Sequence, residues 1–239
     1  MVTTVVEIRE LYDQGRIPEA MDAARDEIKA RLVNDPEIPE LWVILAWCHY
    51  RHKEYDVVRS CLGEAGDTER AYELWATLAA YVDKDDVRLR EIAQRFPGNI
   101  NVQNALVIRA RDADSTIDHV TVLNALTRFT APTIEGANLY HNAARFLLAK
   151  ARNQTDISTA FTIVCLAIEK YGVSANWHHR AAAFFWKSKI AEALKDREEA
   201  LHAAEQSLHF WDEALARDPQ NKGFQGNRDN AIKRIAELQ

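Results

Sequence analysis

Residues 41–58 read LWVILAWCHYRHKEYDVV, and this stretch decides the fold class. Its apolar residues recur at intervals of three and four, as in Leu41, Leu45 and Cys48. That period places apolar side chains on one face of an α-helix. A short polar turn follows, and a second helical pattern begins at Glu54. The stretch therefore predicts two helices that pack antiparallel as a hairpin.

The same helical period extends along the chain, and strand-like alternation never persists. The most β-branched run, IVCLAI at 163–168, lies inside an unbroken stretch from Thr155 to Lys170, so we expect it to be helical too. Pro, Gly, Asp and Asn residues mark the boundaries. The expected helices span about 2–13, 18–32, 38–51, 54–64, 68–82, 86–95, 100–111, 116–129, 136–152, 156–171, 175–195, 197–216 and 224–238.

The gaps within successive pairs of helices are short, so each pair is expected to form an antiparallel hairpin. We expect about six hairpins followed by a C-terminal capping helix, whose apolar residues lie on one side and whose charges lie opposite. Residues 175–216 leave two alternatives open. Nothing in KDREEALHAAE breaks a helix, so this segment forms either one long helix or two.

A repeat is visible in the tryptophans. Trp42 begins the pattern W-x-x-L-A-W, and Trp75, which lies 33 positions later, begins W-x-x-L-A-A-Y. Because a hairpin of this size cannot bury its apolar face alone, similar hairpins stack and share a core, and the pattern recurs every 30 to 40 residues. The alternative is an ordinary helical bundle in which the tryptophans are simply core residues.

These residues resemble the tetratricopeptide repeat (TPR) family, which pairs Trp-x-x-Leu-Gly-x-x-Tyr in a first helix with Ala-x-x-x-Phe and a terminal Pro in a second. Val58 departs from the pattern, because the family has Ala there. The resemblance implies an all-α fold, a superhelical array of antiparallel hairpins in a single domain over 1–239. Its parts would be clear repeats in 1–97, a degenerate segment in 98–134, partial repeats in 135–219 and a capping helix in 220–239.

Composition excludes several classes of protein. Of the 239 residues, 47% are hydrophobic and only 8 are Gly, which is typical of a globular chain and not of a disordered one. The net charge is −6 and no Lys/Arg run is present, so we expect no nucleic acid partner. No signal peptide or apolar span of membrane length is visible, and Cys48, Cys61 and Cys165 are isolated. We expect a cytoplasmic protein without a membrane partner.

No catalytic or metal site is expected. His49 and His52 lie one helical turn apart, but a metal needs three or four ligands and the flanking sequence supplies no others. Glu199 and His202 have the Glu-x-x-His spacing of di-iron bundles, which require a second copy. Nucleophile elbows and phosphate-binding glycine loops are absent. The sequence therefore predicts a non-enzymatic protein without cofactor, metal or catalytic residue.

The TPR resemblance also implies a concave groove lined by the first helix of each hairpin. In the first repeats the corresponding positions are Arg9, Tyr12, Trp47, Tyr50 and Arg51, then Ala80 and Asp83; further along they are His141, Arg145, His178, Phe185 and Trp186. Aromatic rings and guanidinium groups suit an extended or helical peptide of acidic character. The alternative for Trp47 and Tyr50 is a place in the core.

Two functions follow as hypotheses. The first is an adaptor or scaffold that binds a peptide or helical segment of a partner protein in its groove. Because Arg9 lacks a companion Asn, chaperone C-terminal tails are not expected among its targets. The second is a self-associating structural subunit of a larger assembly, in which exposed Phe210, Trp211 or Phe224 would be buried against a copy of the chain. We expect a monomer or weak homodimer.

Overall fold

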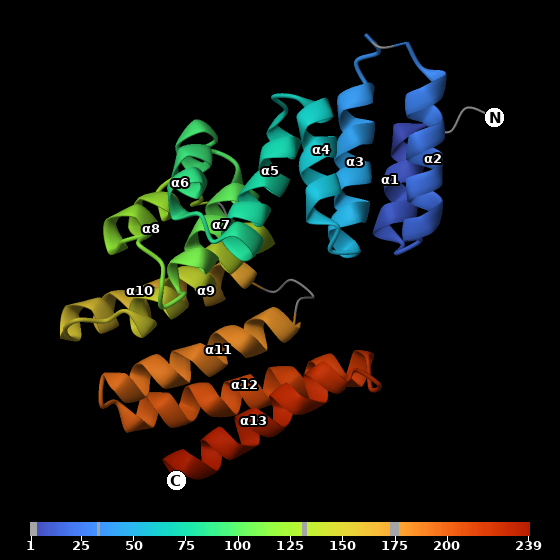
Figure 1. Cartoon of the computed structure of the whole chain (residues 1–239). Helices are drawn as coiled ribbons and strands as arrows, with labels where there is room; N and C mark the ends of the chain where they lie inside the picture. Colours follow the sequence, from blue (N-terminus) through green and yellow to red (C-terminus); the bar gives the residue numbers. More distant parts are fainter. Residues whose placement is uncertain (1–3, 33, 131–132, 173–176) are drawn as a thin grey trace. The chain divides into compact units, whose positions relative to one another are not determined.

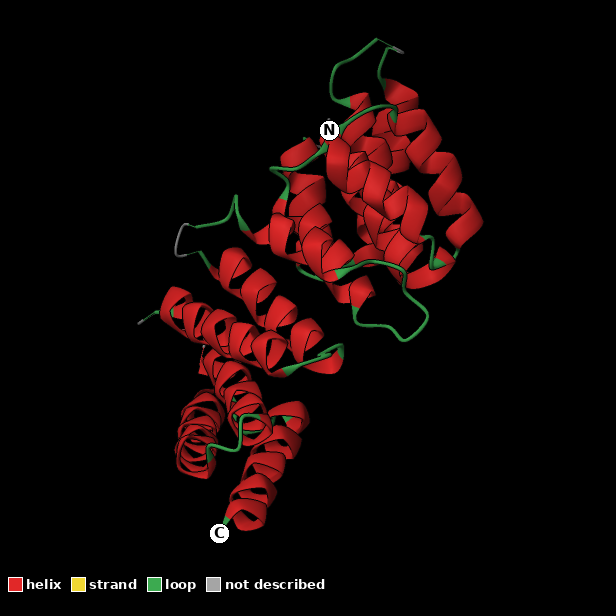
Figure 2. Cartoon of the chain, turned by 90° about the vertical axis from the view of Figure 1, so that its left-hand side faces the viewer, coloured by secondary structure: helices red, strands yellow, loops and turns green. Residues whose placement is uncertain are grey.

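The computed structural model describes residues 4–32, 34–130, 133–172 and 177–239, and every regular element within those ranges is a helix (Figures 1 and 2). The all-α class predicted from the sequence is confirmed. The first residues of the helices expected from 2 and from 175 lie outside the described ranges. The chain divides into two compact units, Met1–Asp83 and Lys84–Gln239. The single array expected over 1–239 stays a prediction.

The first unit is made of successive antiparallel helices with a shared apolar core. Ile8, Leu41, Leu62 and Leu74 are buried in this core, and Ala46 is fully buried where helices approach closely. A π-helical turn over Ala79–Asp83 ends the unit. Its helices are α1 (Val5–Asp13), α2 (Ile17–Ala30), α3 (Ile38–Arg51), α4 (Tyr55–Ala65) and α5 (Glu69–Leu78).

The second unit continues with longer helices. α9 packs against α10 and α11 against α12, and the final helix α13 packs along α12 (Figure 1). α11 and α12 approach closely, because Ser207 Oγ of α12 donates a hydrogen bond to the backbone oxygen of Ala181 at 2.8 Å. The helices of this unit are α6 (Asp86–Arg95), α7 (Ile100–Ala110), α8 (His119–Leu126), α9 (Ile134–Ala149), α10 (Gln154–Tyr171), α11 (Trp177–Ala193), α12 (Arg197–Arg217) and α13 (Lys222–Leu238).

Several helices begin at a side-chain cap, which explains why their starts can be read from the sequence. Thr4 forms a capping box with Glu7, because each side chain bonds the other residue's backbone N–H. Asn99, Asp118 and Thr133 likewise accept from backbone N–H groups of the first turns of α7, α8 and α9. These bonds satisfy N–H groups that have no partner within the helix.

The turn between α11 and α12 decides between the alternatives for residues 175–216. α11 ends at Ala193 and α12 begins at Arg197, so the described part forms two helices. Lys195 between them has a φ of 64°, in the left-handed region that ends a helix. The N–H of the next residue, Asp196, bonds the backbone oxygen of Ala191 at 3.0 Å. This closure reverses the chain without a glycine or proline.

The same turn recurs at two hairpins of the first unit. Gly15, Lys53 and Lys195 all have positive φ, and each lies two residues before the first residue of the next helix. The N–H groups of Arg16 and Glu54 bond Leu11 O at 2.9 Å and His49 O at 3.1 Å, which repeats the bond at the α11–α12 turn. The turn geometry therefore recurs in the backbone, although Lys53 and Lys195 carry no turn signal in the sequence.

Replacing Lys195 by Gly is expected to stabilise the protein. A left-handed conformation costs an L-residue about 1 kcal/mol or more, whereas Gly adopts it freely. We therefore expect Lys195→Gly to raise the free energy of unfolding in urea by about 0.5–1 kcal/mol. Lys233→Gly, at an exposed position inside α13, is the matched control and should lower the free energy of unfolding by about 1 kcal/mol. Equal losses in both variants would contradict the left-handed turn.

Candidate functional site

Three of the predicted groove residues lie together in the first unit. Arg9 and Tyr12 of α1 and Trp47 of α3 line one cavity of about 210 Å³. Its other lining residues are Asp13, Ile44, Arg70 and Glu73, so α5 contributes as well. Residues that are far apart in the sequence are thus brought to one small hollow between the first helices of successive hairpins.

The remaining predicted residues of this unit adjoin that cavity. Arg51 is exposed, its Nε donates to the hydroxyl of Tyr12 at 3.2 Å, and its Cζ lies 5.6 Å from the Tyr12 ring centroid. Tyr50 is half-buried, and its ring meets that of Trp47 edge-on with centroids 5.7 Å apart. Trp47 and Tyr50 pack against the core of the first unit, and Trp47 also lines the cavity. Trp47 therefore packs against the core and also borders the cavity, and its part in binding stays a prediction.

The charge of this first cavity is mixed. The Nη2 of Arg9 lies 2.7 Å from Oε1 of Glu40, and Arg70 Nε lies 3.5 Å from the same carboxylate oxygen. Asp13 and Glu73 add carboxylates to the lining. Because its guanidinium groups already face carboxylates, this cavity gives no special support to an acidic partner. Ala80 is buried and Asp83 pairs with Arg59, so neither extends the lining.

Three other predicted residues meet in the second unit. His141 and Arg145 of α9 and Phe185 of α11 line a cavity of about 280 Å³. Ala182, Trp186, Trp211, Asn227 and Asn230 complete the lining, and none of these eight residues is acidic. We call this the α9–α13 cavity. His178 lies outside it and stacks on Phe224, with ring centroids 5.3 Å apart.

His141 is buried, with 7% of its surface exposed, and its Nδ1 has no hydrogen-bond partner among the described residues. Burial and the positive charges of Arg145 and Arg111 lower the pKa of His141 to about 3. The imidazole is therefore neutral at pH 7, and its buried Nδ1 is a polar atom that no described residue satisfies. The sequence placed His141 in an open groove, whereas in the structure it lies in the wall of a cavity.

Arg145 is half-buried, and its Cζ lies 4.6 Å from the centroid of the Trp186 ring, in a cation–π contact. Its Nε has no hydrogen-bond partner among the described residues. Burial, and then the charge of Arg111, lower the pKa of Arg145 to about 10. The guanidinium remains charged at pH 7. It is a partly desolvated cation with no carboxylate in the cavity lining.

The rings expected to drive self-association lie in different surroundings. Phe210 and Trp211 are buried, with 7% and 5% of their surfaces exposed, so the expectation that they are exposed is wrong. Both pack in an apolar cluster with Ala181 of α11 and Ala231 of α13. Phe224 is half-buried, and its ring centroid lies 5.6 Å from that of Trp211. The final helix α13 covers these rings.

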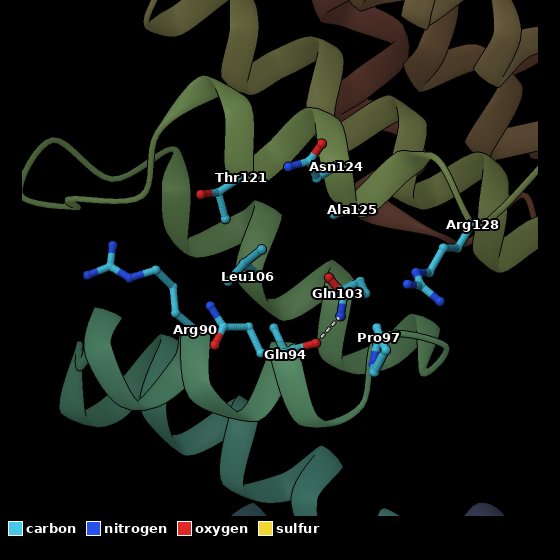
Figure 3. A pocket seen from close by; sticks show the side chains of 10 residues that line it. Arg90, Gln94, Pro97, Gln103, Leu106, Thr121, Asn124, Ala125 and Arg128 are labelled. Carbon is cyan, nitrogen blue, oxygen red and sulfur yellow. Dashed lines mark hydrogen bonds between the residues drawn. The ribbon is translucent and has the colours of Figure 1, made fainter.

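A third cavity, of about 370 Å³, contains none of the predicted residues (Figure 3). It is lined by side chains of α6, α7 and α8 together with Arg128, which follows α8. Figure 3 shows Gln103 inside it, and the Gln103 amide nitrogen donates to Ala93 O at 2.9 Å. The TPR pattern is degenerate in this segment, so it supplied no positions here. A signal was present, because Gln103 interrupts the buried apolar face of α7.

Residues considered for metal binding make other contacts. His49 is buried and pairs with Glu54, and Glu199 pairs with Lys187 at 2.7 Å. In the described part of the chain no group of three or more His, Cys, Asp or Glu side chains is placed to hold a metal ion. Within the same ranges no helix is both long enough and apolar enough to cross a bilayer.

No protein-family model matches this chain, and no curated protein matches it. Among solved structures, the chain is similar to the C-terminal part of a TPR repeat-containing protein from Cytophaga hutchinsonii. That likeness has a TM-score of 0.48 at 13% identity and covers 94% of this chain and 99% of the other. It is too distant to assign a family or a ligand.

Two arginines of the second unit are expected to respond in opposite ways to the same substitution. Arg109 is 3% exposed, and its Nε donates to Asp86 at 2.8 Å. Removing one partner of a buried pair leaves an uncompensated charge, so Arg109→Gln should lower the free energy of unfolding by about 3–5 kcal/mol. Arg145→Gln removes a desolvated charge without breaking an ion pair. It should leave the melting temperature unchanged or raise it, as followed by circular dichroism.

A loss of stability in Arg145→Gln as large as that in Arg109→Gln would show that Arg145 is a structural residue and would contradict its place in a binding cavity. Arg16→Gln serves as the surface control, because Arg16 is exposed and its side chain pairs with Glu19 three residues later. Its free energy of unfolding should change by less than about 0.5 kcal/mol.

Proposed function

We propose that this chain is a non-enzymatic scaffold that holds a segment of a partner protein through side chains on the first helices of its hairpins. One observation carries the proposal. Arg9, Tyr12 and Trp47 line one cavity of the first unit, and His141, Arg145 and Phe185 line one cavity of the second. A groove formed by hairpin stacking brings together residues with this spacing. Packing within an ordinary helical bundle would not by itself bring each of these two sets of residues to a cavity.

The chemistry of the two cavities suits a polypeptide. Tyr12 and Trp47, and likewise Phe185 and Trp186, are half-buried, so their rings offer apolar area to a partner without much further ordering. Guanidinium groups beside these rings add hydrogen-bond donors that recognise carboxylates. The first cavity is lined by residues of both charges, whereas no acidic residue lines the second. A partner with acidic character is supported by the second cavity alone.

Self-association is the less favoured alternative, because Phe210 and Trp211 are already buried within their own unit. A monomer, or at most a weak dimer, fits the proposal better. We also propose a reducing, cytoplasmic setting. Cys48, Cys61 and Cys165 are all free, and burial raises the pKa of the Cys48 thiol to about 11, which keeps it unreactive.

A displayed library of random dodecamer peptides tests the scaffold. Peptides enriched on the wild-type chain are expected to bind the variant Trp47→Ala/Arg51→Ala at least about tenfold more weakly, measured by isothermal titration calorimetry. The matched control is Trp75→Ala. Trp75 is also half-buried against the core of the first unit but lies outside the lining of the cavity, so this variant should keep wild-type affinity.

Circular dichroism shows whether each variant retains its helices. Two results would overturn the scaffold proposal: no peptide is enriched on the wild-type chain, or the enriched peptides bind both folded variants, Trp47→Ala/Arg51→Ala and Arg145→Gln, as tightly as the wild type. Arg145→Gln, assayed in parallel, reports whether a given peptide uses the second unit.

A further inference from the structure

We propose that the α9–α13 cavity is a binding site for a single carboxylate group, with Arg145 as its principal ligand. This inference deepens the proposed function and rests on it only for the identity of the molecule that carries the carboxylate. The cavity is lined by residues from α9, α11, α12 and α13, and none of the lining side chains bears a negative charge. The site therefore supplies a cation and lacks its counter-ion.

The cost of burying Arg145 is the first argument. A charge withdrawn from water destabilises the folded state unless an opposite charge or hydrogen bonds replace its hydration. Elsewhere in the same unit, the two arginines that are almost fully buried are compensated by carboxylates, whereas the half-buried Arg180 lies over a ring as Arg145 does. Arg109 contacts Asp86, Asp112 and Asp114, and Arg234 contacts Glu192 at 2.8 Å. Arg145 has an aromatic ring in place of a carboxylate, which leaves room for one from outside.

The geometry of the cation–π contact is the second argument. The donors of a guanidinium group lie in its plane and point outward from its edge. The Cζ of Arg145 lies over the Trp186 ring, 4.6 Å from its centroid. No carboxylate of the cavity lining faces this guanidinium, and its buried Nε has no acceptor among the described residues. A carboxylate accepts two parallel hydrogen bonds from such an edge.

The other polar groups of the lining are the third argument. His141 is buried and neutral, and its Nδ1, which lacks a partner in the described structure, can donate as the Nδ1–H tautomer. Asn227 and Asn230 lie three residues apart on α13, so both side chains fall on one face of that helix. Each amide brings two N–H donors. Polar side chains from two helices, α9 and α13, therefore line the same cavity as Arg145.

Charge and size select the ligand. Arg145 is the only charged residue in the lining, so a monoanion is matched and a phosphate dianion is not. Phe185, Trp186 and Trp211 form an apolar wall, which suits an apolar stem next to the carboxylate. A volume of about 280 Å³ accommodates one side chain or chain end. The carboxylate is thus presented either by a Glu or Asp side chain or by a polypeptide C-terminus.

Binding of 3-phenylpropionate to the full chain tests the site without any partner protein. We expect it to shift the indole N–H signals of Trp186 and Trp211 in proton–nitrogen NMR spectra, and to leave those of Trp42, Trp47 and Trp75 in place. 3-Phenylpropanamide, which has the same shape without the charge, should bind at least about tenfold more weakly. Inorganic phosphate should leave the two signals unchanged.

Arg145→Gln should weaken 3-phenylpropionate binding at least about tenfold. The matched control is Arg180→Gln. Arg180 also lies over an aromatic ring, with its Cζ 4.3 Å from the Phe210 centroid, and its Nε also lacks a partner in the described structure, but it lies outside the cavity lining. This variant should bind like the wild type. The indole shifts of the wild-type chain locate the site even where a variant fails to fold.

Equal binding of acid and amide, indole shifts confined to the first unit, or full binding by a folded Arg145→Gln variant would each overturn the carboxylate site. Two peptides then show whether a side chain or a chain end supplies the carboxylate. One has a central Glu and an amidated C-terminus, and the other has a free C-terminal carboxylate and no acidic side chain. If no peptide is enriched but 3-phenylpropionate still binds, the scaffold proposal is wrong and the carboxylate site stands.

Discussion

The close approach of α11 and α12 is the constraint on which the second unit depends. Ala181, Ala203 and Ala204 are fully buried along these helices, and Ser207 bonds the backbone of the facing helix directly. Small residues allow this contact because ridges of one helix pack into grooves of the other. Beside this contact, Trp177 and Phe184 of α11 pack against Phe210 of α12. Phe185 and Trp186 instead line the α9–α13 cavity, so the packing of alanines positions the aromatic wall.

Arg109 and Arg145 show how one residue type serves two purposes in the same unit. Arg109 links α6, α7 and the segment before α8, because Asp86 also accepts the backbone N–H of Thr116. Burial alone would raise the pKa of Asp86, but the Thr116 hydrogen bonds and the Arg109 charge outweigh it and lower the pKa. Arg145 lacks such compensation. A compensated cation stabilises a fold, whereas an uncompensated one is suited to a ligand.

The sequence predicted the helices well because their signals are local. Apolar periodicity and N-terminal caps such as Thr4 and Asn99 depend on neighbouring residues only. The sequence placed a break between 195 and 197 but also allowed one continuous helix, since Lys195 adopts a left-handed conformation that its residue type does not indicate. The burial of Phe210 and Trp211 depends on α13, which packs over them in three dimensions.

The candidate site could be predicted in part. Helical spacing selected His141, Arg145 and Phe185, and these residues do share a cavity. The spacing could not show that His141 is buried or that Arg145 stacks on Trp186, because both features depend on the packing of α9 against its neighbours. The cavity around Gln103 was missed altogether. Its residues come from three short helices in a segment where the repeat pattern fades.

The most direct test of the central claim is an NMR titration of His141 in the wild-type chain. The claim is that α9 holds a desolvated Arg145 beside a buried, neutral imidazole, with Arg111 and His179 as the other groups that lower its pKa. The ring C–H signals of His141 should then stay constant from pH 8 to pH 5, and Arg145→Gln should raise the pKa. Titration with a midpoint near 6.5, the ordinary pKa of histidine, would mean that His141 is hydrated and not buried, and would contradict the account.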